Sequence, residues 1–418
     1  MEALLSRIII ENQELIKKKK VLLRNFNIPD IGSINVLTGI RRCGKTYVLY
    51  ENAKKYNQDM VLFIDFEDER LVRLNLLDNY DIILDSYKKI YPDKKPIIFF
   101  DEVQNLKNWH LYIKRLHVAG YKIFVTGSNA YLLSKDIATF LKGRSIETNI
   151  HPFSFKEFLK VKSKDFKNRD FYVKVPEILN LFDEYLVYGA FPEVINTNIY
   201  DKRKVIKNIY NLLFYRDIIV RFNKNEYLMK LVVSKISENI TKEFSISNLA
   251  KKIISLYRTS VPTVTEYFNV LPEPFLTESI YQFRKSFVQR ESKRKTYFID
   301  NSFILINEVE ISKGKFLENL VFNILNRQYD EIFYYKTHNN LEVDFYINLE
   351  GDKKLIQVSY SMSNYDTKTR EVKALKKAMT ELQLNKSYIF TYNEEDIIET
   401  DSGKIEVIPV WKYLLSKQ

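Results

Sequence analysis

The sequence Gly39-Ile40-Arg41-Arg42-Cys43-Gly44-Lys45-Thr46 matches the P-loop pattern G-x-x-x-x-G-K-[ST] at every required position. The apolar residues 34–37 before it predict a short buried strand, and residues 47–53 after it predict the start of a helix. Strand, loop and helix is the context that this motif requires. Gly39 and Gly44 let the backbone N–H groups turn toward an anion, and the helix adds its positive N-terminal end.

Two side chains of this stretch have expected chemical roles. Lys45 is expected to reach the β- and γ-phosphates of a nucleotide, and the hydroxyl of Thr46 to ligate Mg²⁺. The residues predicted to bind the nucleotide are Gly39, Ile40, Arg41, Arg42, Cys43, Gly44, Lys45, Thr46 and Tyr47. Cys43, the single cysteine of the chain, occupies a variable position of the pattern, so we interpret it as filler and not as a reactive thiol.

An acidic motif follows farther along the chain. Residues 96–100 form an apolar run that leads directly into Asp101 and Glu102, which is the form of a Walker B strand buried on both faces. Its carboxyl end would deliver Asp101 to the Mg²⁺ shell, and Glu102 would polarise the water that attacks the γ-phosphate. An ordinary strand ending in an acidic turn gives the same pattern, but the P-loop upstream favours the Walker B interpretation.

Two further polar positions are predicted to complete a hydrolytic site. The strand predicted at residues 121–125 ends in Thr-Gly-Ser-Asn, and Ser128 or Asn129 is expected to align the attacking water, with a simple polar turn as the alternative. Arg144 lies between a predicted helix at 131–141 and a predicted strand at 145–148. A guanidinium there can stabilise charge on a neighbouring subunit's nucleotide, so Arg144 is a candidate arginine finger and implies a homo-oligomer; a surface arginine is the alternative.

Composition bounds the class of protein. At about 150 residues a domain, the 418 residues predict two to four domains. The net charge of +12 favours an anionic partner beyond the nucleotide, with double-stranded DNA as the candidate, although a Lys-rich solvated surface gives the same balance. One cysteine excludes a disulfide framework and a Cys-based zinc site. No apolar run approaches 18 residues, and acidic and basic residues interrupt the N-terminus, so we expect no membrane span and a cytoplasmic location.

The motifs, in their order along the chain, resemble those of a group of archaeal and bacterial AAA-like P-loop ATPases. The segments that carry the resemblance are residues 39–46, 66–71, 99–104, Trp109, 126–130, 143–144 and 151–158. Members of that group carry a C-terminal domain similar to restriction endonucleases. The resemblance implies an α/β AAA-like ATPase core at residues 1–150 and a restriction-endonuclease-like domain at residues 301–418, with ATP and Mg²⁺ as cofactors.

The middle of the chain predicts a helical lid at residues 151–225 and a winged-helix-like domain at residues 226–300. In the lid, Arg216 is a candidate for contact with the phosphates. The winged helix would comprise a helix at 228–240, short helices starting near Ser245 and Val261, and wing strands at 275–276 and 280–283. DNA binding and an architectural role both remain open, the former supported by basic residues after the wing. These basic residues are Arg284, Lys285, Arg290, Lys293, Arg294 and Lys295.

The C-terminal sequence predicts a helix and three strands, which is the core of a PD-(D/E)xK nuclease. Some of the residues at the position of the nuclease site differ from those of the family. The helix at 315–327 bears Glu318, and Asp344 stands where the metal-binding aspartate of that family would stand. Gln357 and Ser359 replace the Glu-x-Lys of the family. Because catalytic Mg²⁺ needs carboxylates beside the substrate phosphate, we predict a fold retained for binding and not for cleavage.

The sequence thus predicts an Mg²⁺-dependent ATPase that couples hydrolysis to conformational change in the C-terminal domains, with DNA as a candidate partner. Two alternatives come from other classes of protein. One is a nucleotide-gated switch that binds DNA or a protein with little turnover, and the other is an active nuclease. Adenine over guanine follows from the resemblance and from the absence of an Asn-Lys-x-Asp motif.

Overall fold

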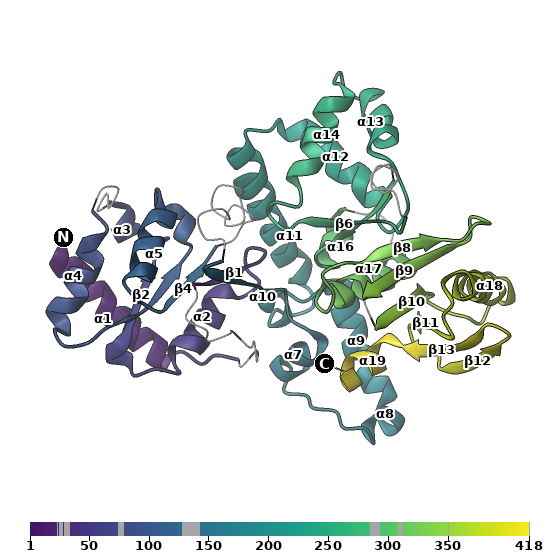
Figure 1. Cartoon of the computed structure of the whole chain (residues 1–418), viewed down its shortest axis with the longest axis horizontal. Helices are drawn as coiled ribbons and strands as arrows, with labels where there is room; N and C mark the ends of the chain where they lie inside the picture. Colours follow the sequence, from purple (N-terminus) through teal and green to yellow (C-terminus); the bar gives the residue numbers. More distant parts are fainter. Residues whose placement is uncertain are drawn as a thin grey trace. The chain divides into compact units, whose positions relative to one another are not determined.

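The computed structural model describes residues 1–22, 24, 28, 34–73, 79–127, 143–284, 293–307, 312–349 and 351–417 (Figure 1). The chain divides into two compact units. Unit 1 comprises Met1–Pro152 with Glu273–Phe275, and unit 2 comprises Phe153–Pro272 and Leu276–Gln418. Among the helices in these ranges, none combines the length and the apolar character that a membrane crossing requires.

Unit 1 is a three-layer α/β structure built on a five-stranded parallel sheet of order β2-β3-β4-β1-β5. Its strands are β1 Ile34–Thr38, β2 Val61–Asp65, β3 Ile97–Asp101, β4 Ile123–Thr126 and β5 Ser145–Asn149. Its helices are α1 Glu2–Lys18, α2 Lys45–Ala53, α3 Glu69–Arg73, α4 Asp81–Ile90 and α5 Trp109–Val118. The parallel sheet confirms the prediction of an α/β P-loop core.

Both faces of this sheet are buried, as expected for parallel strands. One face carries Ile98 and Phe100 into an apolar cluster that also includes residues of α1, α4 and α5. The other face carries Phe63 and Phe99, whose rings lie against Tyr50 of α2 and Phe124 of β4. Alternate residues of each strand therefore enter different layers, and the continuous apolar runs in the sequence follow from this arrangement.

Unit 2 begins with helices that precede its sheet. They are α7 Phe155–Val161, α8 Asp170–Val173, α9 Val175–Tyr188, α10 Pro192–Ile195 and α11 Lys202–Leu212, which continues as a π-helix Leu213–Val220. Next come α12 Glu226–Glu238, α13 Ile246–Ile254 and α14 Val261–Val270. Ser245 and Ser260 cap α13 and α14 by accepting backbone hydrogen bonds from residues three positions later, which matches the predicted helix starts.

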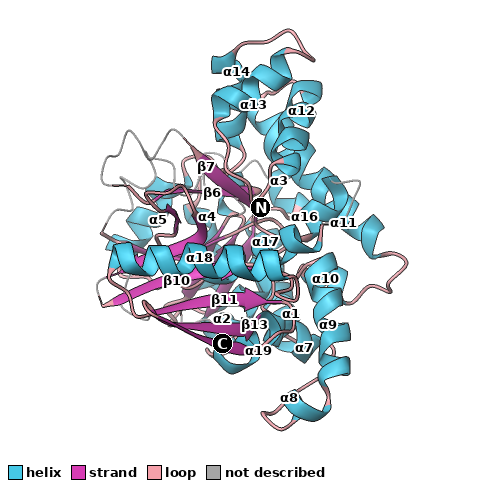
Figure 2. Cartoon of the chain, turned by 90° about the vertical axis from the view of Figure 1, so that its right-hand side faces the viewer, coloured by secondary structure: helices cyan, strands magenta, loops and turns pink. Residues whose placement is uncertain are grey.

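The sheet of unit 2 has eight strands in the order β12-β13-β11-β10-β9-β8-β6-β7. The strands are β6 Thr277–Gln282, β7 Arg294–Phe298, β8 Phe333–Lys336, β9 Glu342–Leu349, β10 Asp352–Val358, β11 Lys386–Thr391, β12 Asp396–Thr400 and β13 Gly403–Pro409. The accompanying helices are α16 Ser302–Asn307, α17 Lys313–Asn326, α18 Tyr365–Leu382 and α19 Val410–Lys417. Figure 2 shows α18 lying across β10, β11 and β13, where Leu375 and Met379 are buried against the sheet.

The predicted wing strands are wrong in part. Residues 275–276 form no strand; β6 pairs antiparallel with β7, and on its other side it pairs in parallel with β8. The two strands are thus the edge of the large sheet and not a separate hairpin. This placement also changes the predicted basic tail, since Lys295 is buried and the guanidinium of Arg294 lies over the rings of Phe268 and Tyr281.

Candidate functional site

The P-loop connects β1 to α2 at the carboxyl edge of the parallel sheet. Gly39 has φ of 138°, and a Cβ atom there would lie 2.2 Å from the carbonyl oxygen of Ile150. Gly44 has φ of 103° and is the N-cap of α2, a conformation that side chains rarely adopt. Both glycines are therefore required by the backbone path, and the first turn of α2 directs its N–H groups toward the loop.

Lys45 and Thr46 start α2 and face the end of the Walker B strand. Lys45 is 4% exposed, and its ammonium group donates to the carbonyl oxygens of Gly39 and Ile40 at 3.1 and 3.3 Å. It also lies 3.8 Å from Oε1 of Glu102. The hydroxyl of Thr46 donates to Oδ2 of Asp101 at 2.6 Å. The structure thus brings together the four residues that two separate motifs predicted.

Asp101 is buried at the end of β3, and its environment is unusual for a carboxylate. Burial and the adjacent charge of Glu102 raise its pKa to about 7, although hydrogen bonds from Thr126 and Thr46 act in the opposite direction. A divalent cation would reverse this effect, because a nearby positive charge favours the ionised form. The hydroxyl of Thr46 and the carboxylate of Asp101 are hard oxygen donors in mutual contact, so this pair fits Mg²⁺.

Sequence analysis did not predict the role of Thr126, the last residue of β4. Its hydroxyl donates to Oδ1 of Asp101 and accepts a hydrogen bond from the backbone N–H of Glu102 at 2.9 Å. Glu102 itself has φ of 49° and ψ of 47°, a left-handed conformation that is uncommon for a residue with a side chain. Thr126 therefore orients both acidic residues from the neighbouring strand. Its position at the tip of a predicted strand was the only signal available.

Two arginines also hold the loop. Arg24 donates from Nη1 to the carbonyl of Cys43 at 3.0 Å and from Nη2 to the carbonyl of His151 at 2.9 Å. Arg41, at a variable position of the P-loop, donates to Oε1 of Glu67 at 3.3 Å. Burial raises the pKa of the Cys43 thiol, which suits a packed filler and not a nucleophile. No periodicity or motif in the sequence indicates this role of Arg24.

The remaining predicted residues of this site lie in different settings. Tyr47 is 43% exposed on α2, and its ring lies edge-on to that of Tyr50. Arg144 is exposed in the turn before β5, where its carbonyl accepts a hydrogen bond from Ile34. Ser128 and Asn129 lie outside the described residues, as do Lys285 and Arg290 of the predicted basic tail. Arg216 lies exposed in the π-helix of unit 2.

The residues predicted for the altered nuclease-like site of unit 2 lie together. Glu318 of α17 and Asp344 of β9 both contact the ammonium group of Lys295, at 3.3 and 2.8 Å. Gln357 of β10 accepts a hydrogen bond from the backbone N–H of Asp344 at 3.1 Å. Burial and the charge of Asp344 raise the pKa of Glu318, whereas the ammonium group of Lys295 acts in the opposite direction. Lys295 was not predicted here, because its strand is distant in sequence and its basic neighbours indicated a surface tail.

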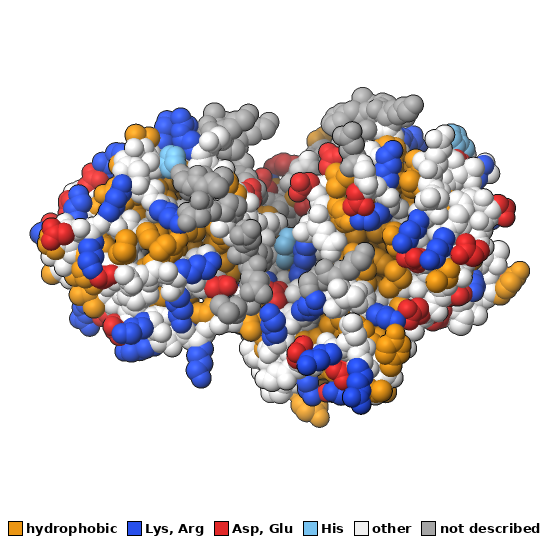
Figure 3. Space-filling model, turned by 60° about the horizontal axis from the view of Figure 1, so that its bottom comes forward, with side chains coloured by type: hydrophobic (Ala, Val, Ile, Leu, Met, Phe, Trp, Pro, Cys, Tyr) orange, Lys and Arg blue, Asp and Glu red, His pale blue; other side chains and the backbone are white. Residues whose placement is uncertain are grey.

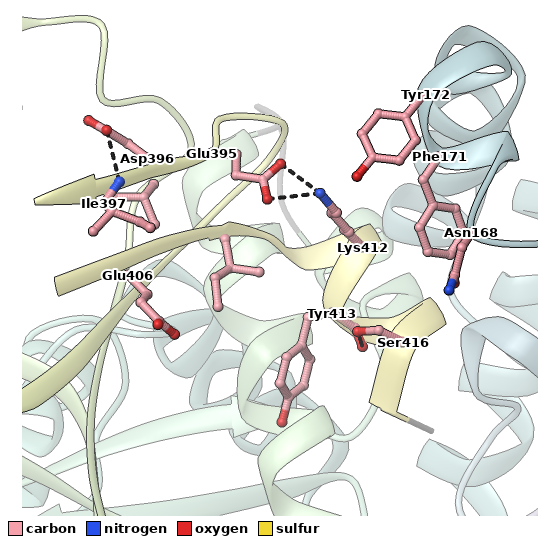
Figure 4. A pocket seen from close by; sticks show the side chains of 12 residues that line it. Asn168, Phe171, Tyr172, Glu395, Asp396, Ile397, Glu406, Lys412, Tyr413 and Ser416 are labelled. Carbon is pink, nitrogen blue, oxygen red and sulfur yellow. Dashed lines mark hydrogen bonds and ion pairs between the residues drawn. The ribbon is translucent and has the colours of Figure 1, made fainter. Parts of the chain in front are cut away.

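A separate cavity of about 780 Å³ lies in unit 2 between α8, β12, β13 and α19. Figure 4 shows Phe171 and Tyr172 on one side of it and the ion pair of Lys412 with Glu395 near its centre, with distances of 2.7 and 2.8 Å. Its lining includes no residue of the P-loop, the Walker B strand or the Lys295 cluster. The volume of this cavity alone therefore does not identify it as an active site.

Comparisons with known proteins agree with the geometry of unit 1. A model of the AAA domain matches residues 32–159, and two domains of unknown function, DUF8612 and DUF4143, match residues 179–307 and 313–413. A Walker-type ATPase of Pyrococcus abyssi is similar in structure over 70% of this chain and 99% of its own, but at 13% identity and a TM-score of 0.43 nothing is inferred from it.

Two relatives are similar over nearly the whole chain. An uncharacterized protein of Haemophilus influenzae is 26% identical, covering 97% of this chain and 100% of its own. The uncharacterized protein MJ1544 of Methanocaldococcus jannaschii is 35% identical over 431 residues, covering 99% of this chain and 95% of its own. The chain therefore belongs to the same family as MJ1544, and its residues 32–159 match the AAA domain.

Proposed function

We propose that the chain hydrolyses ATP to ADP and phosphate with Mg²⁺. The observation that carries this proposal is the 2.6 Å contact between Thr46 of the P-loop and Asp101 of the Walker B strand. The chemistry that Mg²⁺ would supply here is positive charge against the negative charge that develops on the transferred phosphoryl group. Thr46 and Asp101 would hold the ion, and Lys45 would exchange its carbonyl contacts for phosphate oxygens.

Glu102 is the proposed base in this reaction. Its carboxylate would accept a hydrogen bond from the attacking water and orient it toward the γ-phosphate. Thr126 fixes the backbone of Glu102, so the carboxylate need not reorganise during the reaction. Asn129 is proposed to align the same water, and Arg144 to stabilise charge on the nucleotide of a second copy of this chain.

Phosphate release by three variants tests the proposal. Lys45→Ala should reduce turnover by about 100-fold or more through loss of a phosphate contact, and Glu102→Gln should do so while ATP binding persists. Lys54→Ala, an exposed lysine just after the same helix, is the matched control and should behave as wild type. Unchanged phosphate release in the first two variants would refute the assignment.

A second candidate function is a nucleotide-gated switch on double-stranded DNA. We propose that α12, α13 and α14 form a helix-turn-helix. The residues before β6, together with the large sheet, would stand where an independent wing was predicted. Lys251, Lys252 and Arg258 are exposed at the end of α13 and in the turn after it, where they can meet phosphates. This function predicts DNA binding that ATP alters, and slow ATP hydrolysis in the absence of DNA. An architectural role of the three helices predicts no DNA binding at low salt.

A third candidate, phosphodiester hydrolysis in unit 2, would use Glu318, Asp344 and Gln357. It predicts metal-dependent cleavage of DNA that Asp344→Ala abolishes. Cleavage that survives this change would place the activity elsewhere. We favour ATP hydrolysis over this candidate because Gln357 offers only a neutral oxygen and Ser359 cannot supply a cation.

A further inference from the structure

Lys295 is a buried cation in β7 whose ammonium group lies among three carboxylates. The residue is 1% exposed. Its ammonium nitrogen lies 2.8 Å from Oδ1 of Asp344, 2.8 Å from Oε1 of Glu342 and 3.3 Å from Oε1 of Glu318. An ammonium group has three hydrogens to donate, and three carboxylates surround it. The donor capacity of the lysine is therefore matched by its acceptors.

The charge of this lysine is retained in spite of burial. Burial alone lowers the pKa of Lys295, but Asp344, Glu318 and the other neighbouring groups outweigh this effect and hold the pKa well above its ordinary value. A charged group that is removed from water needs partners of opposite charge with good geometry. The three carboxylates meet this need from α17 and β9, so the cluster joins these two elements to β7.

Other donors also contact the carboxylates of this cluster. Oδ2 of Asp344 accepts the backbone N–H of Val358 at 2.9 Å, and Oε1 of Glu318, which contacts Lys295, also accepts the hydroxyl of Tyr297 at 3.0 Å. The amide of Gln357 donates to Glu371 at 2.6 Å while its oxygen accepts from Asp344. Mg²⁺ requires nearly octahedral oxygen ligands at about 2.1 Å, which these paired atoms do not offer. Within the described ranges, no group of three or more His, Cys, Asp or Glu side chains is arranged to hold a metal.

We infer that the ammonium group of Lys295 takes the place of a divalent cation between Glu318 and Asp344, so that the nuclease-like site of unit 2 is a metal-free ion cluster. A metal-dependent cleavage site would need this position for its ion. The inference does not depend on ATP hydrolysis in unit 1. Phosphate release measures that hydrolysis, whereas Mn²⁺ binding and the melting temperature measure the cluster.

Binding of Mn²⁺ to the nucleotide-free chain is the first test. Electron paramagnetic resonance counts free and bound Mn²⁺, and the wild-type chain is compared with Asp344→Asn. Any ion held near the P-loop contributes equally to both proteins, so the difference reports the cluster. We expect no difference in bound Mn²⁺ between the two proteins up to 1 mM Mn²⁺, a concentration about tenfold above the dissociation constant of a useful metal site. One additional Mn²⁺ ion in the wild-type chain, lost in Asp344→Asn, would overturn the inference.

Removal of the ammonium group is the second test. Lys295→Met keeps the length of the side chain but leaves buried carboxylates without their cation, so we expect the melting temperature to fall by about 10 °C. Added Mn²⁺ should restore at least half of this loss, and the further change Asp344→Asn should abolish the restoration. Lys293→Met, an exposed lysine that pairs with Glu243, is the matched control and should show neither effect. A folded Lys295→Met protein that is indifferent to Mn²⁺ contradicts the inference, and if this variant does not fold, the first test decides.

Discussion

At the scale of single residues, Asp101 combines a requirement for charge with an environment that opposes it. Without a cation, burial beside Glu102 raises its pKa to about 7, whereas the unfolded chain has the ordinary value near 3.8. A raised carboxyl pKa means that the folded state binds the proton more tightly. Its contribution to stability is therefore complete below about pH 4 and is lost as the pH rises toward 7.

This linkage predicts the behaviour of Asp101→Asn in the nucleotide-free protein. At pH 3 the two proteins should unfold alike, since side chain 101 is then neutral in both the folded and the unfolded chains, and at pH 8 the variant should be more stable by at most about 4 kcal/mol. Fluorescence of Trp109 in a Trp411→Phe background follows unit 1 alone, because these are the two tryptophans of the chain. Mg²⁺ with ATP should stabilise the wild type more than the variant at pH 8. A difference that grows toward acid pH would contradict the prediction.

The residues predicted from sequence are those that lie in contiguous motifs. Lys45, Thr46, Asp101 and Glu102, which the motifs predict, lie together in the structure because a loop and the strand end beside it fix their geometry within a few residues. The roles of Thr126, Arg24 and Lys295 were missed because each contacts its partners across more than 15 positions of sequence. A single sequence contains no signal for such pairs when neither member stands in a recognised pattern.

At the scale of elements, strand and helix positions followed the periodicity closely, while pairing between strands did not. The runs at 61–66 and 96–100 became β2 and β3 because apolar residues in a parallel sheet are buried on both faces. The same periodicity cannot say which strands are neighbours. The parallel contact of β6 with β8 spans about 50 residues of sequence, and this pairing turned a predicted hairpin into a sheet edge.

Helix α7 provides a test of how a local signal acts on an element. The hydroxyl of Ser154 accepts a hydrogen bond from the N–H of Glu157, whose carboxylate accepts in return from the N–H of Ser154 at 2.6 Å. Ser154→Ala should therefore lower the free energy of unfolding of unit 2 by about 1 kcal/mol. Ser312→Ala is the control, because Ser312 stands at the N-cap of α17 without a side-chain capping bond. Urea unfolding followed by Trp411 in a Trp109→Phe background measures both, and equal losses would disprove the role of the capping box.

At the scale of the whole molecule, the net charge of +12 does not form an unbroken basic patch on the face drawn in Figure 3. Lys and Arg side chains on the face drawn in Figure 3 are interspersed with Asp and Glu. In the predicted basic tail, Lys293 pairs with Glu243 and Lys295 is buried, so the tail offers fewer phosphate contacts than its sequence indicates. If DNA is a partner, the exposed basic residues of the α13–α14 turn are better placed to bind it.

The exposed lysines of α13 are predicted to control DNA affinity. Lys251→Glu with Lys252→Glu should weaken binding to a double-stranded DNA fragment and lower its salt dependence, whereas Lys204→Glu with Lys207→Glu, exposed on α11, should leave most of both. Each phosphate contact contributes about −0.9 to the slope of log K against log salt, so the first pair should remove about 2 from the slope. Fluorescence anisotropy between 50 and 200 mM salt, with and without ATP, measures these slopes.

Phosphate release without DNA should be unchanged in both double variants, because α11 and α13 belong to unit 2 and the P-loop belongs to unit 1. Equal losses in the two double variants would show that total charge, and not the helix-turn-helix, determines the affinity.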